Sequence, residues 1–117
     1  MRQLIKKSLL ALAMVVAACS AHAAELIMVE EHGCVYCERF NREIAPAYSK
    51  TSEGKQAPLR RLLLSEPWPS QLQDVRPATV TPTFILINDG QEVDRLIGYP
   101  GDEHFWFLLN TMLEKLP

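Results

Sequence analysis

The stretch EEHGCVYC, residues 30–37, decides which fold and function this sequence predicts. It joins an apolar run at residues 26–29, typical of a buried strand, to a helical pattern that starts near Cys37. The two cysteines therefore stand where a strand ends and a helix begins. Unpaired N–H groups and the positive end of the helix dipole favour a thiolate at Cys34. Cys37 follows about one helical turn later, which is close enough for a disulfide.

A dithiol at such a corner can exchange two electrons with a disulfide of another protein. The Cys34 thiolate would attack the substrate disulfide, and Cys37 would then resolve the mixed disulfide and release the reduced substrate. The sequence therefore predicts a thiol–disulfide oxidoreductase that needs no cofactor, with Cys34 as nucleophile and Cys37 as resolving cysteine. His32 and Tyr36 are candidates for tuning the Cys34 thiolate, because both stand two residues from it.

Three other interpretations of the motif stay open at this point. The pair could be a structural disulfide, although a bridge that closes so short a loop contributes little through chain entropy. It could hold copper or zinc together with His32, as in a metallochaperone, but the sequence has no second CxxC motif and His104 lies far along the chain. The chain could also be a regulatory or interaction protein that responds to redox state without catalysis.

Residues 1–23 have the pattern of a signal peptide. Three basic residues among the first seven precede an apolar run of about ten residues, which is too short to span a membrane. Residues 21–23 then form a small-x-small cleavage site, so we expect cleavage after Ala23. The alternative is a lipoprotein signal over residues 1–18, with a lipid on Cys19. Either leader predicts export to the periplasm, where disulfides persist.

The mature chain, residues 24–117, is long enough for one small domain. Loss of the leader removes three of the 12 basic residues and none of the 14 acidic ones, so the net charge falls from −2 to −5. An acidic surface argues against nucleic acid or anionic lipid as a partner. The mature chain also keeps one pair of cysteines, since Cys19 leaves with the leader or carries the lipid.

The first half of the mature chain predicts a strand, a helix and a second strand. Phe40, Ile44 and Tyr48 form an apolar stripe at helical spacing, and Pro46 should kink or shorten that helix. Residues 51–54 should end it. Residues 59–64 predict the second strand, parallel to the first because a helix connects them.

The second half begins with a short helix that we expect over residues 70–75, with Ser70 as its cap and Leu72 and Val75 on its apolar face. Residues 83–87 predict the clearest strand, and the turn at residues 88–90 leads into an antiparallel strand at residues 91–97. In this last strand Val93 and Ile97 are expected to point inward.

The last helix should begin with Asp102 as its cap. Its apolar residues recur at helical spacing and predict a face buried against the sheet. They are Phe105, Leu108, Leu109, Met112, Leu113 and Leu116.

The resulting order is β-α-β-α-β-β-α, with the CxxC after the first strand and Thr81-Pro82-Thr83 before the third. This arrangement resembles the thioredoxin fold in its minimal form, an α/β fold with a mixed four-stranded sheet flanked by helices. The resemblance covers nearly all of residues 24–117. It implies that Pro82 is cis and lies beside the CxxC, and that Thr81 pairs its backbone with an extended substrate segment. Trp68 and Tyr99 are candidates for lining that peptide groove.

More narrowly, the chain is similar to the small periplasmic thioredoxin-like proteins of bacterial sulfur-oxidation (Sox) clusters, the SoxS-like proteins. The similarity rests on residues 31–37, 43–48, 50–61 and 98–101. It implies a reductase that keeps a partner's cysteine reduced, for example the thiol of a Sox sulfur-carrier protein. The electrons would come from a membrane thiol transporter of the CcdA/DsbD kind. We expect the protein to act as a monomer.

The sequence departs from thioredoxin at two places. Met28 stands where thioredoxin has a buried carboxylate, so proton transfer to or from Cys37 would use water, Glu30, Glu31 or His32. The dipeptide between the cysteines is Val-Tyr, closer to the Pro-Tyr of glutaredoxins than to Gly-Pro, and no glutathione site is recognisable. The direction of electron flow therefore stays open, because a few tens of millivolts shift the equilibrium tenfold.

Overall fold

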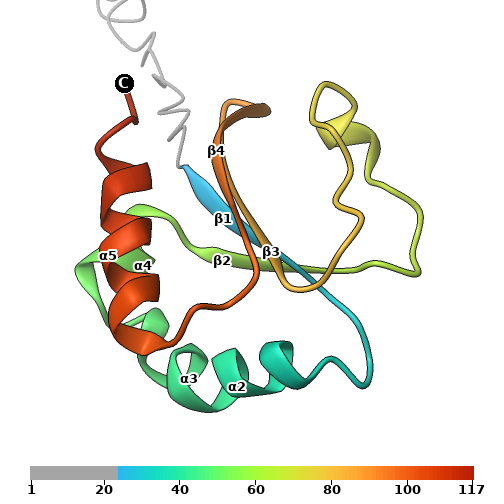
Figure 1. Ribbon diagram of the computed structural model, residues 1–117. Helices are drawn as coiled ribbons and strands as arrows, with labels where there is room; N and C mark the ends of the chain where they lie inside the picture. Colours follow the sequence, from blue (N-terminus) through green and yellow to red (C-terminus); the bar gives the residue numbers. More distant parts are fainter. Residues whose placement is uncertain (1–23) are drawn as a thin grey trace, which may run out of the picture.

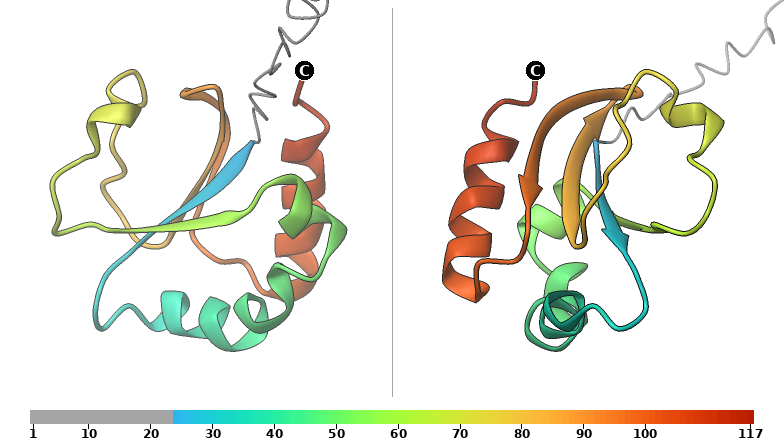
Figure 2. Two further views of the ribbon diagram at one scale, coloured as in Figure 1. Left: turned by 180° about the vertical axis from the view of Figure 1, so that it is seen from behind. Right: turned by 45° about the vertical axis from the view of Figure 1, so that its right-hand side comes forward.

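Helices cover one face of a single sheet, and a long loop covers the other (Figure 1). The computed structural model describes residues 24–117, and both leader predictions, including the one for Cys19, lie outside the described residues. Figure 2 shows α2 (Val35–Glu43) and α5 (Asp102–Leu113) on the same side of the sheet. The polypeptide between the second and third strands crosses the opposite side.

The sheet has four strands in the order β2-β1-β3-β4. The strand β1 (Glu25–Glu30) pairs in parallel with β2 (Leu59–Leu63) and antiparallel with β3 (Thr83–Asn88). The strand β4 (Gln91–Ile97) pairs antiparallel with β3 at the other edge. The predicted mixed four-stranded sheet, its parallel second strand and its antiparallel last strand are therefore confirmed. Because β1 and β3 are central and covered on both faces, their sequences are continuous apolar runs rather than alternating ones.

Alternation along the two central strands divides the core between the two faces. Leu26 and Met28 point toward the helices, whereas Ile27 and Val29 point toward the loop on the other side. On the helix side the ring of Phe40 lies 4.8 Å from that of Phe84 and 5.2 Å from that of Phe105, measured between centroids. These aromatic contacts fix α2 and α5 to the sheet and to each other.

The single helix expected after the CxxC is divided into two. It begins at Val35, two residues earlier than expected, and α2 ends at Glu43 because Pro46 has no N–H to continue the ladder. The helix α3 (Ala45–Tyr48) starts again with Pro46 in its first turn. The predicted effect of Pro46 is therefore confirmed.

Residues 51–54 were expected to end the helix, but they begin another, α4 (Ser52–Gln56). Thr51 caps it, because its hydroxyl oxygen accepts a hydrogen bond from the Gly54 N–H at 3.0 Å. A Cβ atom at Gly54 would lie 1.8 Å from the carbonyl oxygen of Tyr48. A glycine is therefore needed for α4 to pack this closely on the end of α3.

The short helix expected at residues 70–75 is only a 3₁₀ turn, η1 (Ser70–Leu72). Pro69 rather than Ser70 occupies the capping position, and no side chain caps the turn. Leu72 and Val75 are buried against the sheet as predicted, 1% and 2% exposed. Two apolar anchors hold this segment in place without the hydrogen-bonded turns of a longer helix.

The prediction that Ile97 points inward is wrong, because its side chain is 61% exposed. The register between β3 and β4 shifts by one residue near Val93, so Leu86 pairs with Asp94 whereas Ile87 pairs with Glu92. This bulge reverses the alternation, and Leu96 packs toward the helices together with Val93. Ile97 is left on the opposite face.

The last helix also begins differently from the prediction. Gly101, with a φ of 97°, is the capping residue, and Asp102 is the first residue of α5. The apolar stripe is confirmed except at Leu108, which is half-buried and lies outside the main core. Trp106, which was not part of the predicted stripe, packs against the core, and its ring stacks on that of Tyr48 with centroids 6.0 Å apart.

Candidate active site

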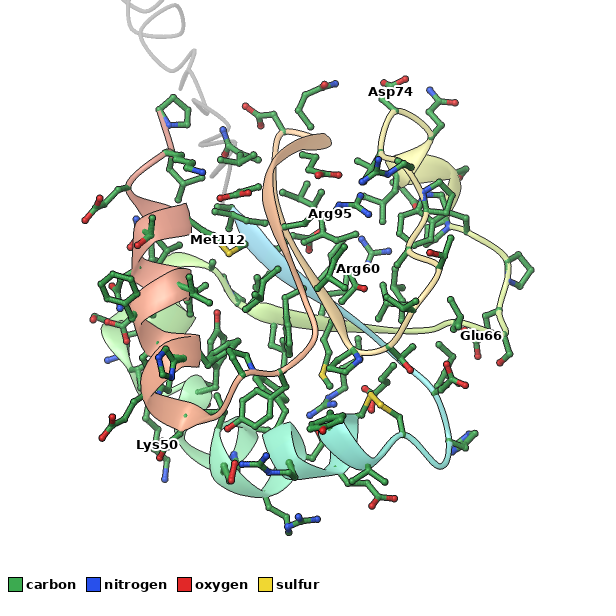
Figure 3. All side chains as sticks on the ribbon, in the orientation of Figure 1. Lys50, Arg60, Glu66, Asp74, Arg95 and Met112 are labelled. Atoms are coloured by element: carbon green, nitrogen blue, oxygen red, sulfur yellow. A yellow bond between two sulfur atoms is a disulfide. The ribbon has the colours of Figure 1, made fainter. Side chains whose placement is uncertain are left out.

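Cys34 and Cys37 form a disulfide at the start of α2, visible as the yellow bond in Figure 3. Their Cα atoms are 5.2 Å apart. Cys34 is the capping residue of the helix, and its Sγ accepts a hydrogen bond from the Cys37 N–H at 3.1 Å. Cys34 is half-buried, whereas Cys37 is 2% exposed. A second sulfur compound can therefore reach Cys34, while Cys37 lies behind it.

The helix start gives Cys34 a favourable electrostatic environment. A sulfur at the capping position lies next to N–H groups that have no partner within the helix, and it meets the positive end of the helix dipole. Both effects stabilise a thiolate more than a thiol, so they lower the pKa of a cysteine placed there. The hydrogen bond from the Cys37 N–H to Cys34 Sγ is one such contact.

The peptide bond between Thr81 and Pro82 is cis, and it lies beside the cysteine corner. The antiparallel register pairs Val29 with Thr83, and its continuation brings Thr81 opposite Glu31. The Thr81 hydroxyl donates a hydrogen bond to Glu31 Oε2 at 2.8 Å, which joins the two segments directly. Pro82 is buried and its carbonyl accepts a hydrogen bond from the Gly98 N–H at 2.8 Å. The predicted substrate-binding segment at Thr81 and Pro82 is therefore brought to the turn that precedes Cys34.

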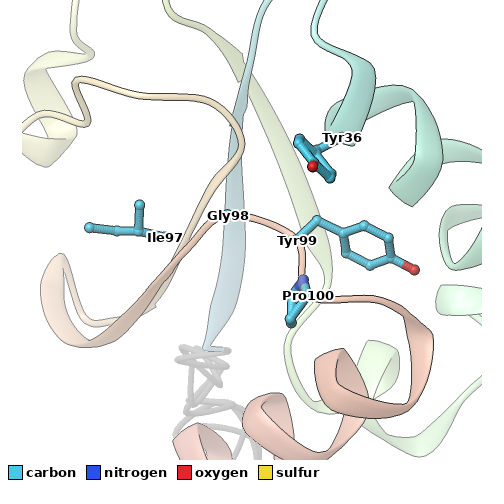
Figure 4. Close-up of a pocket in the computed structure, with 5 residues that line it drawn as sticks. All are labelled: Tyr36, Ile97, Gly98, Tyr99 and Pro100. Carbon is cyan, nitrogen blue, oxygen red and sulfur yellow. The ribbon is translucent and has the colours of Figure 1, made fainter.

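The two candidates for thiolate tuning lie on the surface. Tyr36 is 55% exposed and lines a shallow cavity of about 300 Å³ with Tyr99 and its neighbours (Figure 4). Figure 4 shows Tyr36 and Tyr99 on the same side of this cavity, while Ile97 points away from them. His32 is exposed on the turn before Cys34, and no hydrogen bond or ion pair within residues 24–117 involves it.

Tyr99 fastens the loop after β4 to the cysteine helix. Its hydroxyl donates a hydrogen bond to Glu43 Oε2 at 2.8 Å, and Arg39 pairs with Glu43 at 3.1 Å. The Tyr99 hydrogen bond first, and then Arg39, hold the pKa of the Glu43 carboxyl below its usual value. Burial, and secondly the Glu43 carboxylate, raise the pKa of the Tyr99 phenol. Because Gly98 in the same loop bonds to Pro82, α2 and the cis-proline loop are connected through this contact.

Glu30 lies on the same face of β1 as the buried Met28, toward α2. Its side chain is 17% exposed, and Arg61 donates to it at 2.7 Å. Asn41, about one helical turn beyond Cys37, contacts the other carboxylate oxygen at 3.5 Å. Glu30 and Glu31 were both expected to transfer protons to or from Cys37. Glu30 lies under α2, the helix that carries the cysteines. Glu31 instead contacts the cis-proline loop.

Exposed apolar side chains surround this corner. Apart from Phe107 on α5, the large apolar side chains exposed within residues 24–117 lie between the two cysteines or directly before Thr81 or Gly98 in the sequence. We call these four the apolar rim: Val35, Tyr36, Val80 and Ile97. Val80 and Ile97 also line a second cavity of about 490 Å³. The sequence did not predict the exposed position of Ile97, because no residue type marks the bulge. The Glu31–Thr81 pair could have been predicted from the alignment of β1 with β3.

Trp68 does not belong to the site. Its indole N–H donates to the Leu72 carbonyl at 2.9 Å, and the ring packs on the loop side of the sheet. Within residues 24–117, no group of three or more His, Cys, Asp and Glu side chains is placed to bind a metal ion. His104 is exposed on α5. None of the helices described for residues 24–117 is long and apolar enough to span a membrane.

Comparison with solved structures supports this picture. The periplasmic thioredoxin SoxS from Paracoccus pantotrophus, in its reduced form, is 44% identical and superposes with a TM-score of 0.74 over 79% of this chain and 97% of that protein. Trxlp from Edwardsiella tarda is 26% identical, with a TM-score of 0.58 over 76% of this chain and 84% of that one.

More distant matches show the fold alone. The thioredoxin Mala s 13 from Malassezia sympodialis is 19% identical, with a TM-score of 0.57 over 79% of this chain and 76% of that one. No curated protein matches the chain at a significant level. The thioredoxin-like domain family matches residues 10–113, which is most of the sequence. With that match and a CxxC disulfide at the start of α2, the chain belongs to the thioredoxin-like family and is a thiol–disulfide oxidoreductase.

Proposed function

We propose that this enzyme works as a reductase of protein disulfides in the periplasm, with Cys34 as nucleophile and Cys37 as resolving cysteine. The observation that carries the assignment of roles is the contrast between the two sulfurs. Cys34 caps α2, accepts a backbone hydrogen bond and is half-exposed, whereas Cys37 is buried behind it. The reacting thiolate must meet a large substrate, and the resolving thiol must not.

The reaction balances within the two proteins. In the reduced enzyme, the Cys34 thiolate attacks one sulfur of the substrate disulfide, and the other substrate sulfur leaves as a thiolate that takes a proton from solvent. Cys37 then loses its proton and attacks Cys34 Sγ, which releases the second substrate thiol. Two electrons have passed to the substrate, and the enzyme is left with the Cys34–Cys37 disulfide.

Glu30 is the proposed acceptor for the Cys37 proton. Met28 cannot take a proton, and Glu30 is the next residue on the same face of β1. Its contacts with Arg61 and Asn41 hold the carboxylate under α2, and its 17% exposure leaves a path to water. A positioned carboxylate of this kind serves as a general base.

The substrate would lie as an extended segment between the two ends of the apolar rim. Thr81, directly before the cis proline, would pair its backbone with that segment, and Tyr36 and Ile97 would contact the substrate side chains on either side. Burial of apolar side chains supplies affinity without demanding a particular sequence. This suits an enzyme whose substrates share a disulfide rather than a motif.

The likeness to SoxS supports a periplasmic setting linked to sulfur oxidation. We therefore propose a Sox sulfur-carrier protein as the substrate whose cysteine is kept reduced. A membrane thiol transporter of the CcdA/DsbD kind would return the electrons. The enzyme would act as a monomer, without nucleic acid as a partner.

The reductase direction is tested by the reduction potential of the Cys34–Cys37 pair, measured by equilibration with glutathione or dithiothreitol. We expect a value closer to the roughly −270 mV of thioredoxin than to the roughly −120 mV of strong periplasmic oxidants. A potential near the oxidant end would contradict the reductase assignment. The roles of the two cysteines are tested with Cys37→Ser, which should accumulate a mixed disulfide with an oxidised substrate protein, whereas Cys34→Ser should not.

A further inference from the structure

Glu31 is fixed between the nucleophile and the cis-proline loop. Its carbonyl oxygen accepts a hydrogen bond from the Cys34 N–H at 3.4 Å, and its carboxylate accepts one from Thr81 at 2.8 Å. The first contact closes the turn that leads to the nucleophile. The second holds an exposed carboxylate against the residue before Pro82. A side chain that would otherwise move freely in solvent is thereby held beside the path of the substrate.

The charge of this carboxylate is not compensated by a neighbour. Glu30, the preceding residue, is neutralised by Arg61 at 2.7 Å, but no basic side chain within residues 24–117 forms an ion pair with Glu31. The hydroxyl of Thr81 restrains the carboxylate without carrying charge. An exposed carboxylate is negative at neutral pH. The apolar rim has no charge of its own, and Glu31 places a negative charge at the turn that leads to Cys34.

We propose that Glu31 makes the enzyme select disulfides that carry positive charge close to the reacting sulfur, and disfavour those that carry negative charge. This inference rests on the proposed function, because it concerns the choice of substrate at the same site. Because the Glu31 carbonyl contacts the Cys34 N–H, groups a few bonds from the attacked sulfur would approach the carboxylate to within several ångströms. At such distances in a water-like medium, one unit charge changes a rate about two- to threefold at low salt. A protein substrate with lysine or arginine beside its cysteine would react faster than one with aspartate or glutamate.

Small disulfides of different charge test this directly. The reduced protein is oxidised at pH 8 by cystamine, by bis(2-hydroxyethyl) disulfide and by 3,3′-dithiodipropionate, which carry positive, zero and negative charge. Second-order rate constants are measured for the wild type and Glu31→Gln, each divided by that variant's rate with the neutral disulfide. This ratio removes any change in the general reactivity of Cys34. Glutamine keeps the shape of the side chain and an oxygen for the Thr81 bond.

We expect Glu31→Gln to lower the cystamine ratio and raise the dithiodipropionate ratio, each about two- to threefold at low salt. In 1 M KCl, where the screening length is about 3 Å, the two proteins should give the same ratios. Asp74→Asn is the matched control, because it removes one exposed negative charge at the end of the molecule away from the disulfide (Figure 3). It should leave both ratios unchanged. Thr81→Val, which releases the carboxylate, should weaken the charge preference without reversing it.

Equal ratios in the wild type and Glu31→Gln would overturn the inference, as would an equal change in Asp74→Asn. Failure of the proposed function has a different signature. In that case the neutral disulfide itself would oxidise the reduced wild type no faster than it oxidises an ordinary thiol. The neutral disulfide thus tests the reactivity of Cys34, and the two charged ones test Glu31.

Discussion

Cys37 needs a proton acceptor nearby, because a buried thiol has to lose its proton before it can attack. It belongs to the same buried core as Met28, which neither accepts nor donates a proton. Burial in apolar surroundings raises the pKa of a thiol, so deprotonation would be slow without help. Glu30, held by Arg61 and Asn41 on the same side of the sheet, is the general base that we propose for this step.

Replacement of Glu30 by glutamine should therefore slow the resolving step. We expect the rate at which Cys37 displaces a preformed mixed disulfide on Cys34 to fall about tenfold or more, because a positioned general base is lost. The rate of the variant should rise steadily with pH, since hydroxide must replace the carboxylate. Rapid mixing and acid quenching at several pH values would measure it.

Glu25→Gln is the matched control for this experiment. Glu25 stands at the other end of β1 and pairs with Arg60 at 3.2 Å, as Glu30 pairs with Arg61. Loss of that ion pair should leave the resolving rate unchanged. Wild-type rates for Glu30→Gln at every pH would show that water alone accepts the proton.

At the scale of elements, the site depends on contacts that join the cysteine helix to the end of the sheet. Tyr99 and Glu43 connect the loop after β4 to α2, and Gly98 in that loop bonds to Pro82. The two halves of the site are thus positioned by one short loop. The Tyr99–Glu43 hydrogen bond also makes this connection sensitive to acid.

The pKa of Glu43 in the folded protein lies below its ordinary value of 4.5, chiefly because of the Tyr99 hydrogen bond. Its contacts therefore stabilise the fold fully above the unfolded-state pKa, and this contribution is lost as the pH falls through the folded-state value. We expect the urea midpoint of the wild type to fall between pH 6 and pH 3, and to fall less in Glu43→Gln and Tyr99→Phe. Circular dichroism at a series of pH values would measure the midpoints. An equal acid-induced fall in wild type and both variants would contradict the assignment.

The bulge between β3 and β4 determines which way Ile97 points. It turns Ile97 outward into the apolar rim, so the side chain is available to a substrate and contributes little to the core. Ile97→Ser should leave the free energy of unfolding within about 0.5 kcal/mol of the wild type. It should lower the kcat/KM for a protein disulfide several-fold, because burial of apolar area in the complex is lost, and leave the rate with a small neutral disulfide unchanged.

Phe107→Ser serves as the control, because Phe107 is 69% exposed on α5 and stands outside the apolar rim. It should change neither rate. If Ile97→Ser and Phe107→Ser have the same effect on the protein substrate, the apolar rim is not the substrate surface.

For the whole molecule, the sequence predicted the order of elements along the chain, the parallel second strand, the antiparallel last strand and the position of the cysteine pair. Those features follow from long apolar runs, from a helical connection between parallel strands and from a motif at their junction. The breaks of the helix after Cys37 could be predicted only in part, because Pro46 is visible in the sequence but the packing of Gly54 on Tyr48 is not.

The details of the site were harder to predict, because they arise from strand register. Ile97 was assigned to the wrong face since a bulge has no fixed residue signature. Asp102 was predicted as the capping residue of the last helix, whereas it is the first residue of α5 and Gly101 is the cap. The contact between Glu31 and Thr81 joins residues 50 positions apart and depends on how β1 and β3 align. The residue types therefore predict the chemistry of the site, whereas the pairing of the strands determines which side chains lie beside the cysteines.

Cys34 should be a poised nucleophile at the start of α2, and the pH dependence of its alkylation is the experiment that decides this. In Cys37→Ser, Cys34 is the single thiol of residues 24–117 and the N–H at position 37 is retained. The rate of reaction with iodoacetamide is measured from pH 4 to pH 10. We predict a midpoint below the roughly 8.5 of a free cysteine, and a faster reaction at pH 7. A midpoint at or above that of free cysteine, or a thiol that reacts only after unfolding, would show that Cys34 is not the nucleophile.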